Sequence, residues 1–79
     1  KTLSVLFNQL SKRETQVLDG VLQGKSNKSI AEMLCISVKT IEVHRANLMS
    51  KLNVKTVTEL VRLAIEAITI EPHIHNSLL

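Results

Sequence analysis

Two helical patterns lie next to each other in the middle of this chain, and the short segment between them constrains the fold more than any other feature. In the first pattern Ile30 and Leu34 recur at helical spacing, and the pattern ends near Cys35. Ser37 has the chemistry of a helix cap, and an apolar pattern starts again at Ile41. Because so few residues connect them, the two helices have to cross sharply, which is the geometry of a helix-turn-helix.

Capping signals predict one further helix on each side of this pair. Ser11–Glu14 and Thr56–Glu59 both have the Ser/Thr-x-x-Glu pattern of a capping box, in which side chains and backbone amides hydrogen-bond reciprocally. Gly24 ends the first of these helices, since glycine readily adopts the left-handed conformation found there. Either Ser26 or Asn27 caps the helix that follows.

These signals predict an all-α domain of four helices over residues 10–70, with the third helix over about residues 38–52 and the fourth over about 57–69. Residues 1–9 are predicted to form a linker or a helical lead-in, and residues 71–79, which include Pro72, a frayed tail. The composition agrees with packed helices, because 44% of the residues are hydrophobic and Phe7 is the only aromatic one. The chain begins with Lys1 rather than Met, so we expect a piece of a longer protein.

The sequence also argues against several classes of protein. Cys35 is the only cysteine, which excludes an internal disulfide and favours a cytoplasmic location. No apolar run approaches the ~20 residues that span a bilayer, and no signal peptide is recognisable, so we expect no membrane contact. The histidines lack zinc-ligand spacing, and no catalytic constellation or Gly-rich phosphate loop stands out. We therefore expect no metal, no cofactor and no enzymatic activity.

Positive charge and small side chains are concentrated around the two central helices. Residues 25–55 hold six basic and two acidic side chains, in a chain whose net charge is +3. At helical spacing, the inner side of the predicted third helix carries Val38, Ile41, Arg45, Leu48 and Leu52. The outer side carries Lys39, Val43, Ala46, Asn47 and Ser50. These small or polar groups leave room for a close partner surface, and the major groove of DNA, about 12 Å wide, admits one helix.

A series of residues at fixed spacing runs through the chain. They are Leu10-Ser11-Lys12-Arg13-Glu14, Gly24, Asn27-Lys28-Ser29-Ile30-Ala31, Ile36-Ser37-Val38-Lys39-Thr40-Ile41, His44 and Lys51-Leu52. In these residues the chain resembles the LuxR/FixJ-type helix-turn-helix, the DNA-binding output domain of many bacterial response regulators, over residues 10–68. The resemblance implies that the third helix enters the major groove, that the fourth forms a dimer contact, and that a phosphorylatable receiver domain precedes this segment. The chain departs from the usual pattern at Cys35, where helix-turn-helix motifs often have Gly, and at Val57, where a basic residue is common.

The predicted interface divides into base-reading and phosphate-binding residues. The candidates for base readout are Lys39, Glu42, Val43, Ala46 and Asn47. Of these, Glu42 lies on the flank and either accepts a hydrogen bond from a cytosine or pairs with a neighbouring basic side chain. The candidates for phosphate contact are Ser26, Asn27, Lys28, Thr40, Lys51, Lys55 and Thr56. A buried guanidinium needs a partner, so we also predict an ion pair between Glu14 and Arg45 that fixes the third helix against the first. His44 is interpreted as a packed side chain.

The function predicted from the sequence is sequence-specific binding of double-stranded DNA for transcription regulation, as the output domain of a two-component response regulator. The wide apolar arc of the fourth helix predicts a homodimer through Val61, Ile65 and Ile68, with RNA polymerase as a candidate further partner. Two alternatives remain open. One is a promoter-recognition domain of a sigma factor, and the other is a helical protein-interaction module whose basic face is incidental.

Overall fold

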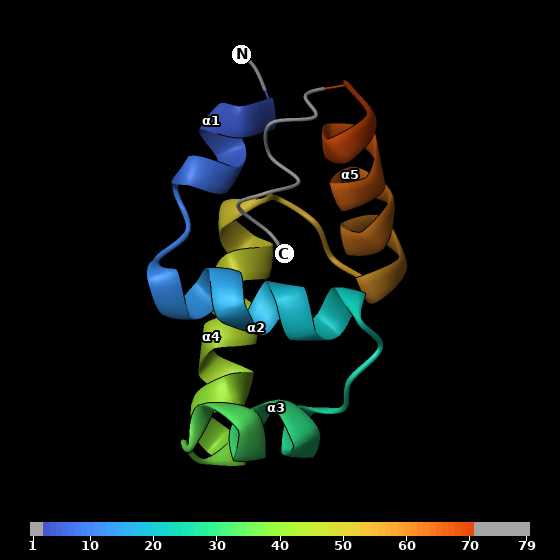
Figure 1. Cartoon of the computed structure of the whole chain (residues 1–79). Coiled ribbons are helices and arrows are strands. Elements are labelled where there is room, and N and C mark those ends of the chain that lie inside the picture. The colour runs from blue at the N-terminus through green and yellow to red at the C-terminus, as the bar shows by residue number, and fades with distance from the viewer. Residues whose placement is uncertain (1–2, 71–79) are drawn as a thin grey trace.

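The described part of the protein is built entirely from helices, which confirms the predicted all-α class. The computed structural model describes residues 3–70, so the predicted tail at 71–79 lies outside the described residues. Within this range the helices are α1 (Leu3–Asn8), α2 (Lys12–Leu22), α3 (Asn27–Leu34), α4 (Val38–Lys51) and α5 (Val57–Ile70). Figure 1 shows α2 crossing in front of α4, with α3 below them and α5 on the opposite side of the molecule from α1. Four of these helices match those predicted from the sequence, and α1 is a short additional one.

Serine side chains start the three central helices, as predicted for Ser11 and Ser37, and of the two candidates Ser26 and Asn27 it is Ser26 that caps α3. Ser11 caps α2, Ser26 caps α3 and Ser37 caps α4, each accepting a hydrogen bond from the backbone amide three residues later at 3.0–3.1 Å. Ser11 completes a capping box, because its own amide donates to Oε1 of Glu14 at 2.9 Å. These bonds satisfy backbone amides that have no partner inside the helix.

The start of α5 differs in one detail from the predicted capping box. The Thr56 hydroxyl accepts from the Glu59 amide at 3.1 Å, as expected. The Glu59 carboxylate, however, accepts from the amide of Lys55 at 2.7 Å, one residue earlier than in a capping box. The carboxylate still satisfies an amide at the helix start, so the cap serves the same purpose.

Left-handed residues end α2, α3 and α4. These residues are Gly24 (φ 80°), Cys35 (φ 59°) and Asn53 (φ 56°). In each case the next amide closes a bond to a carbonyl five residues earlier, at 3.0 Å, as in a Schellman motif. Cys35 therefore performs the turn function that helix-turn-helix motifs often give to glycine, although its Cβ makes this conformation less favourable.

The core lies where α4 packs against α2 and α3. The side chains that are completely inaccessible to solvent include Val17, Leu18, Ile30, Ile41, Leu48 and Leu60. Phe7 adds its ring to this core from α1. Gly20 allows α2 and α3 to approach closely, because a Cβ atom at this position would lie 2.7 Å from Cγ1 of Ile30. One continuous apolar cluster thus holds α3 and α4 together.

Candidate nucleic-acid interface

The exposed side of α4 carries all five residues predicted to read bases. Lys39, Glu42, Val43, Ala46 and Asn47 are all exposed, and Val43 is 51% exposed although it is apolar. Ile41 and Leu48, on the opposite side of the same helix, are fully buried. The structure therefore brings these five residues together on one outward face. Their contact with bases stays a prediction.

A hydrogen bond ties the start of α3 to the middle of α4. Nη1 of Arg45 donates to Oδ1 of Asn27 at 2.6 Å, and both side chains are half-buried. The bond connects residues 18 positions apart, across the turn of the helix-turn-helix. It adds a polar link to the apolar packing of α3 on α4.

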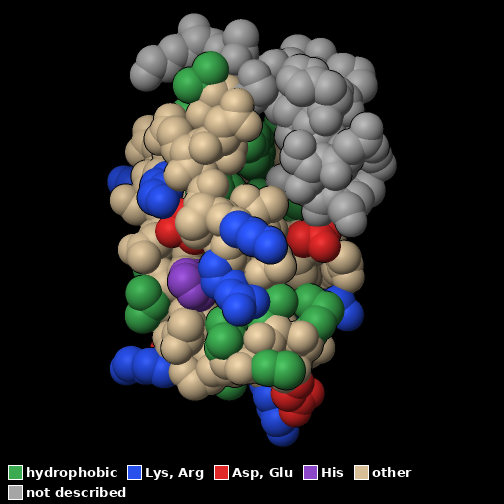
Figure 2. Space-filling view, turned by 60° about the vertical axis from the view of Figure 1, so that its left-hand side comes forward, with side chains coloured by type: hydrophobic (Ala, Val, Ile, Leu, Met, Phe, Trp, Pro, Cys, Tyr) green, Lys and Arg blue, Asp and Glu red, His purple; other side chains and the backbone are tan. Residues whose placement is uncertain are grey.

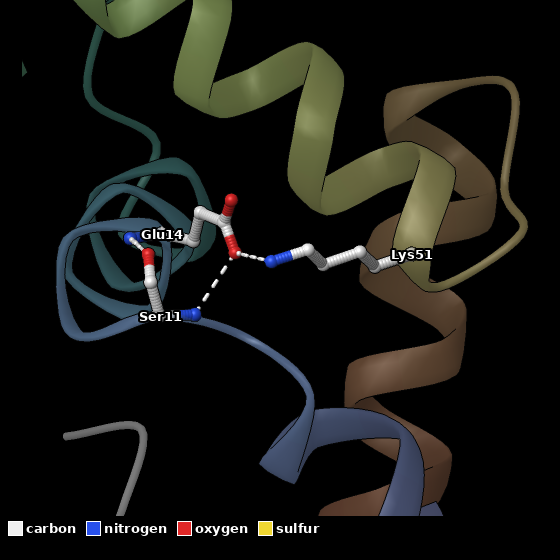
Figure 3. Close-up of polar contacts among 3 residues, drawn as sticks. All are labelled: Ser11, Glu14 and Lys51. Atoms are coloured by element: carbon white, nitrogen blue, oxygen red, sulfur yellow. Dashed lines mark hydrogen bonds and ion pairs between the residues drawn. The ribbon is translucent and has the colours of Figure 1, made fainter.

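The predicted ion pair between Glu14 and Arg45 is wrong. Glu14 does pair with a basic residue of α4, but that residue is Lys51, whose Nζ donates to Oε1 of Glu14 at 2.8 Å (Figure 3). Arg45 and Lys51 are six residues apart, which separates them by about 9 Å along the helix axis. The start of α2 lies beside the last turn of α4, whereas Arg45 lies beside α3. Helical spacing alone could not show which of these two basic residues pairs with Glu14.

The Glu14 carboxylate is buried and ionised. Burial by itself would raise its pKa, because a charged group loses its hydration. The hydrogen bond from Lys51, the bonds from Ser11 and the positive charge of Lys51 outweigh this effect and hold the pKa of Glu14 below its ordinary value. Figure 3 shows the carboxylate between the Ser11 amide and the Lys51 ammonium, so a single side chain caps α2 and anchors the end of α4.

The phosphate-binding candidates differ in whether their side chains already have a partner within the domain. Lys28 and Lys55 are exposed. Four other side chains already have partners within the domain: Ser26 and Thr56 cap helices, Thr40 shares a bond of 2.8 Å with Ser37, and Asn27 accepts from Arg45. The Lys51 side chain is 39% exposed, and Glu14 compensates its charge. Its contact within the domain is therefore a structural one between α4 and α2. No local pattern indicates the partners of Asn27 or Lys51, because both contacts join distant segments.

Basic groups are spread over the face of the molecule that α3 and α4 present. Figure 2, which turns the left-hand side of Figure 1 forward, shows Lys and Arg side chains across the middle and lower part of the molecule, with apolar groups between them.

His44 is half-buried on α4, in line with its interpretation as a packed side chain. Residues 3–70 contain no cluster of three potential metal ligands, and none of their helices is long and apolar enough to cross a membrane.

A separate apolar hollow lies on α5. It has a volume of about 430 Å³ and is lined by Val57, Thr58, Val61, Arg62 and Ile65. Ile65 is 59% exposed and Val57 39% exposed. Of the three residues predicted to form a dimer contact, Val61 and Ile65 line this hollow, whereas Ile68 packs partly against the core.

These features define a class of protein. A helix-turn-helix that exposes small and polar side chains on its second helix, flanked by basic residues, is the architecture of a DNA-binding domain. Comparison with known proteins identifies the particular family: residues 8–64 match the family described as "Bacterial regulatory proteins, luxR family". The chain belongs to this family of DNA-binding transcription regulators.

Individual relatives support the assignment. The chain is 53% identical over 58 residues to the transcriptional regulatory protein FixJ of Bradyrhizobium diazoefficiens, covering 73% of this chain and 28% of FixJ. It is 48% identical over 60 residues to the oxygen regulatory protein NreC of Staphylococcus epidermidis, covering 76% of this chain and 28% of NreC. The chain thus spans little more than a quarter of these relatives.

A solved structure shows the same fold. The crystal structure of full-length FixJ from B. japonicum superimposes on 82% of this chain and 32% of FixJ, with a TM-score of 0.78 and 48% identity. The two proteins therefore share the fold over the part that superimposes.

Proposed function

We propose that residues 10–70 form the DNA-binding output domain of a two-component response regulator, which binds specific sequences on bacterial DNA in the cytoplasm to regulate transcription. The observation that carries the proposal is the exposed face of α4, where five small, polar or charged residues lie opposite the fully buried Ile41 and Leu48. A phosphorylatable receiver domain in the whole protein is part of the proposal. Its support is the similarity to FixJ and NreC, which are several times longer than the matched segment.

In this mechanism α4 lies in the major groove and α3 braces it against the phosphate backbone. Lys39 and Asn47 donate to base edges, while Val43 and Ala46 fit against thymine methyl groups. Glu42 lies on the flank of this face. The amides at the start of α3 and the ammonium groups of Lys28 and Lys55 contact phosphates, which position the domain without specifying a sequence.

Dimerisation is the second part of the mechanism. Val57, Val61 and Ile65 leave an apolar surface on α5 that a second copy of the chain can cover. A two-fold dimer places two α4 helices in successive major grooves, so the operator has two related half-sites. RNA polymerase is a further proposed partner of the assembled dimer.

The test begins with selection of bound duplexes from a random pool, followed by affinity measurements on the selected sequence and on random DNA. We expect affinity to fall steeply with salt, because phosphate contacts release counterions. Changing Lys39 or Asn47 to Ala should weaken binding to the selected sequence by about 1–3 kcal/mol and binding to random DNA much less.

Arg62→Ala on α5 is the matched control for Lys39→Ala, since it removes one exposed basic charge that lies in the hollow on α5 and outside the proposed DNA interface. On a duplex with a single half-site it should bind like the unaltered chain. Equal losses on both kinds of DNA would make Lys39 and Asn47 phosphate contacts. Failure of the unaltered chain to bind any duplex at low salt would reject the proposal in favour of a protein-interaction module.

A further inference from the structure

The half-buried side chain of Arg45 has a neutral amide as its partner and not a carboxylate. Arg45 lies between Ile41 and Leu48 in the sequence of α4, on the side that faces the rest of the domain. Within residues 3–70, Glu14 pairs with Lys51 and not with Arg45. The polar contact of Arg45 is instead a short hydrogen bond of 2.6 Å to the side-chain oxygen of Asn27.

This contact fixes the orientation of the Asn27 amide. A guanidinium has only donors, so the carboxamide must turn its oxygen toward Arg45. The NH₂ group of Asn27, with both of its donors, is then directed away from Arg45. Without Arg45 the carboxamide would be free to rotate, and either its oxygen or its nitrogen could face outward.

The oriented NH₂ group adds to other donors at the same place. Asn27 is the first residue of α3, directly after the Ser26 cap. The backbone amides of Asn27 and Lys28 belong to the first turn of the helix, where no intrahelical acceptor is available. The exposed Lys28 side chain follows. Backbone, carboxamide and ammonium donors are therefore all present at the end of α3 that the proposed mechanism sets against the DNA backbone.

We infer that Arg45 is a positioning residue: it holds the Asn27 carboxamide so that Nδ2 donates to a DNA phosphate, and it thereby sets α3 and α4 in register on the duplex. This role rests on the proposed function. Arg45 itself does not touch the DNA. Its effect on affinity passes through Asn27, which makes the two residues energetically dependent on each other.

A double-mutant cycle on this chain tests the dependence. The variants are Asn27→Ala, Arg45→Met and the two combined, with DNA affinity measured by titration and folding checked by urea unfolding. Methionine retains much of the apolar stem of Arg45. We expect each single variant to bind DNA about tenfold more weakly, the scale of one hydrogen bond to a charged group, and the combined variant to bind no worse than the weaker single one. Additive losses would overturn the inference.

The salt dependence of binding gives a second, independent readout. Asn27 is neutral, so losing its contact lowers affinity and leaves the slope of log affinity against log salt nearly unchanged. Lys28→Met is the matched control, because loss of a charged phosphate contact should reduce the slope by about 0.9. A reduction of that size in Arg45→Met would show that Arg45 binds a phosphate directly, which overturns the positioning role.

Asn27→Asp separates the DNA contact from the fold. Aspartate keeps an oxygen for Arg45 and adds a favourable negative charge at a helix N-terminus, so the domain should be at least as stable as before. It removes the NH₂ donors and turns negative charge toward the phosphate, so DNA binding should fall by more than in Asn27→Ala. Unchanged binding by this variant would overturn the inference. Absence of DNA binding by the unaltered chain would instead reject the proposed function itself.

Discussion

Glu14 and Lys51 join the first turn of α2 to the last turn of α4 through a contact of 2.8 Å between Oε1 and Nζ. Glu14 is 5% exposed, so the pair lies at the edge of the core. The same carboxylate accepts from the Ser11 amide at 2.9 Å. Loss of its negative charge would therefore weaken a helix cap and a contact between helices at the same time.

This arrangement predicts a stability that falls in acid. The pKa of Glu14 is lower in the folded chain than its ordinary value near 4.5. Its stabilising contribution is therefore complete above the ordinary pKa and is lost as the pH falls through the folded pKa. We expect Glu14→Gln to lower the free energy of unfolding by about 1–2 kcal/mol at pH 7 and to have little effect once the folded pKa has been passed. Urea unfolding at a series of pH values measures both.

Lys51→Met is the companion variant. It leaves the carboxylate buried without its cation, so the pKa of Glu14 should rise, and the loss of stability in acid should become smaller than in the unaltered chain or disappear. If the loss of stability caused by each variant were the same at every pH, the charge of Glu14 would have no part in the effect.

The close approach of Gly20 to Ile30 predicts a cost for a small added group. In an exposed helix Gly→Ala would be favourable by about 1 kcal/mol. Here the new Cβ would lie 2.7 Å from Cγ1 and 2.9 Å from Cδ1 of Ile30, which is fully buried and cannot move away freely. Overpacking of this kind costs about 1–3 kcal/mol, so we expect Gly20→Ala to lower the free energy of unfolding. In an Ile30→Val background, which removes Cδ1, the same change should cost less. An equal cost in both backgrounds would argue against the contact.

Features that depend on neighbouring residues were predictable from the sequence, and contacts between distant segments were not. Ser11, Ser26 and Ser37 start helices because a hydroxyl caps the amide three residues ahead, which needs no knowledge of the fold. The exposed face of α4 followed from helical periodicity in the same way. The partner of Glu14, by contrast, depends on where α2 crosses α4, and periodicity placed Arg45 correctly without indicating that Asn27 lies beside it.

The turn between α3 and α4 predicts a stabilising substitution. Cys35 is exposed and adopts φ 59° and ψ 41°, a conformation that costs a residue with a Cβ roughly 1–2 kcal/mol. Glycine has no such cost but loses more entropy on folding. We therefore expect Cys35→Gly to raise the free energy of unfolding by about 1 kcal/mol. Cys35→Ala is the control, since it removes the sulfur and keeps the Cβ. Equal stabilisation by alanine and glycine would show that backbone strain is not the cause.

The apolar hollow on α5 predicts the effect of one charge on the proposed dimer. Ile65 is 59% exposed, more than Val57 at 39%, so the fold should tolerate Ile65→Glu. The change should place two carboxylates in a two-fold interface. We expect the unaltered chain to bind a duplex with two half-sites more tightly than one with a single half-site. Ile65→Glu should lose at least about tenfold on the paired site and little on the single site.

Val5→Glu provides the matched control for Ile65→Glu, because Val5 is a 46% exposed apolar residue of α1, outside the hollow. It introduces the same charge and should keep the preference for paired half-sites. Titration of both duplexes, with sedimentation of the protein–DNA complexes to count the bound chains, measures the difference. If Ile65→Glu still bound the paired site as two cooperating copies, the dimer contact would have to lie elsewhere than on this face of α5.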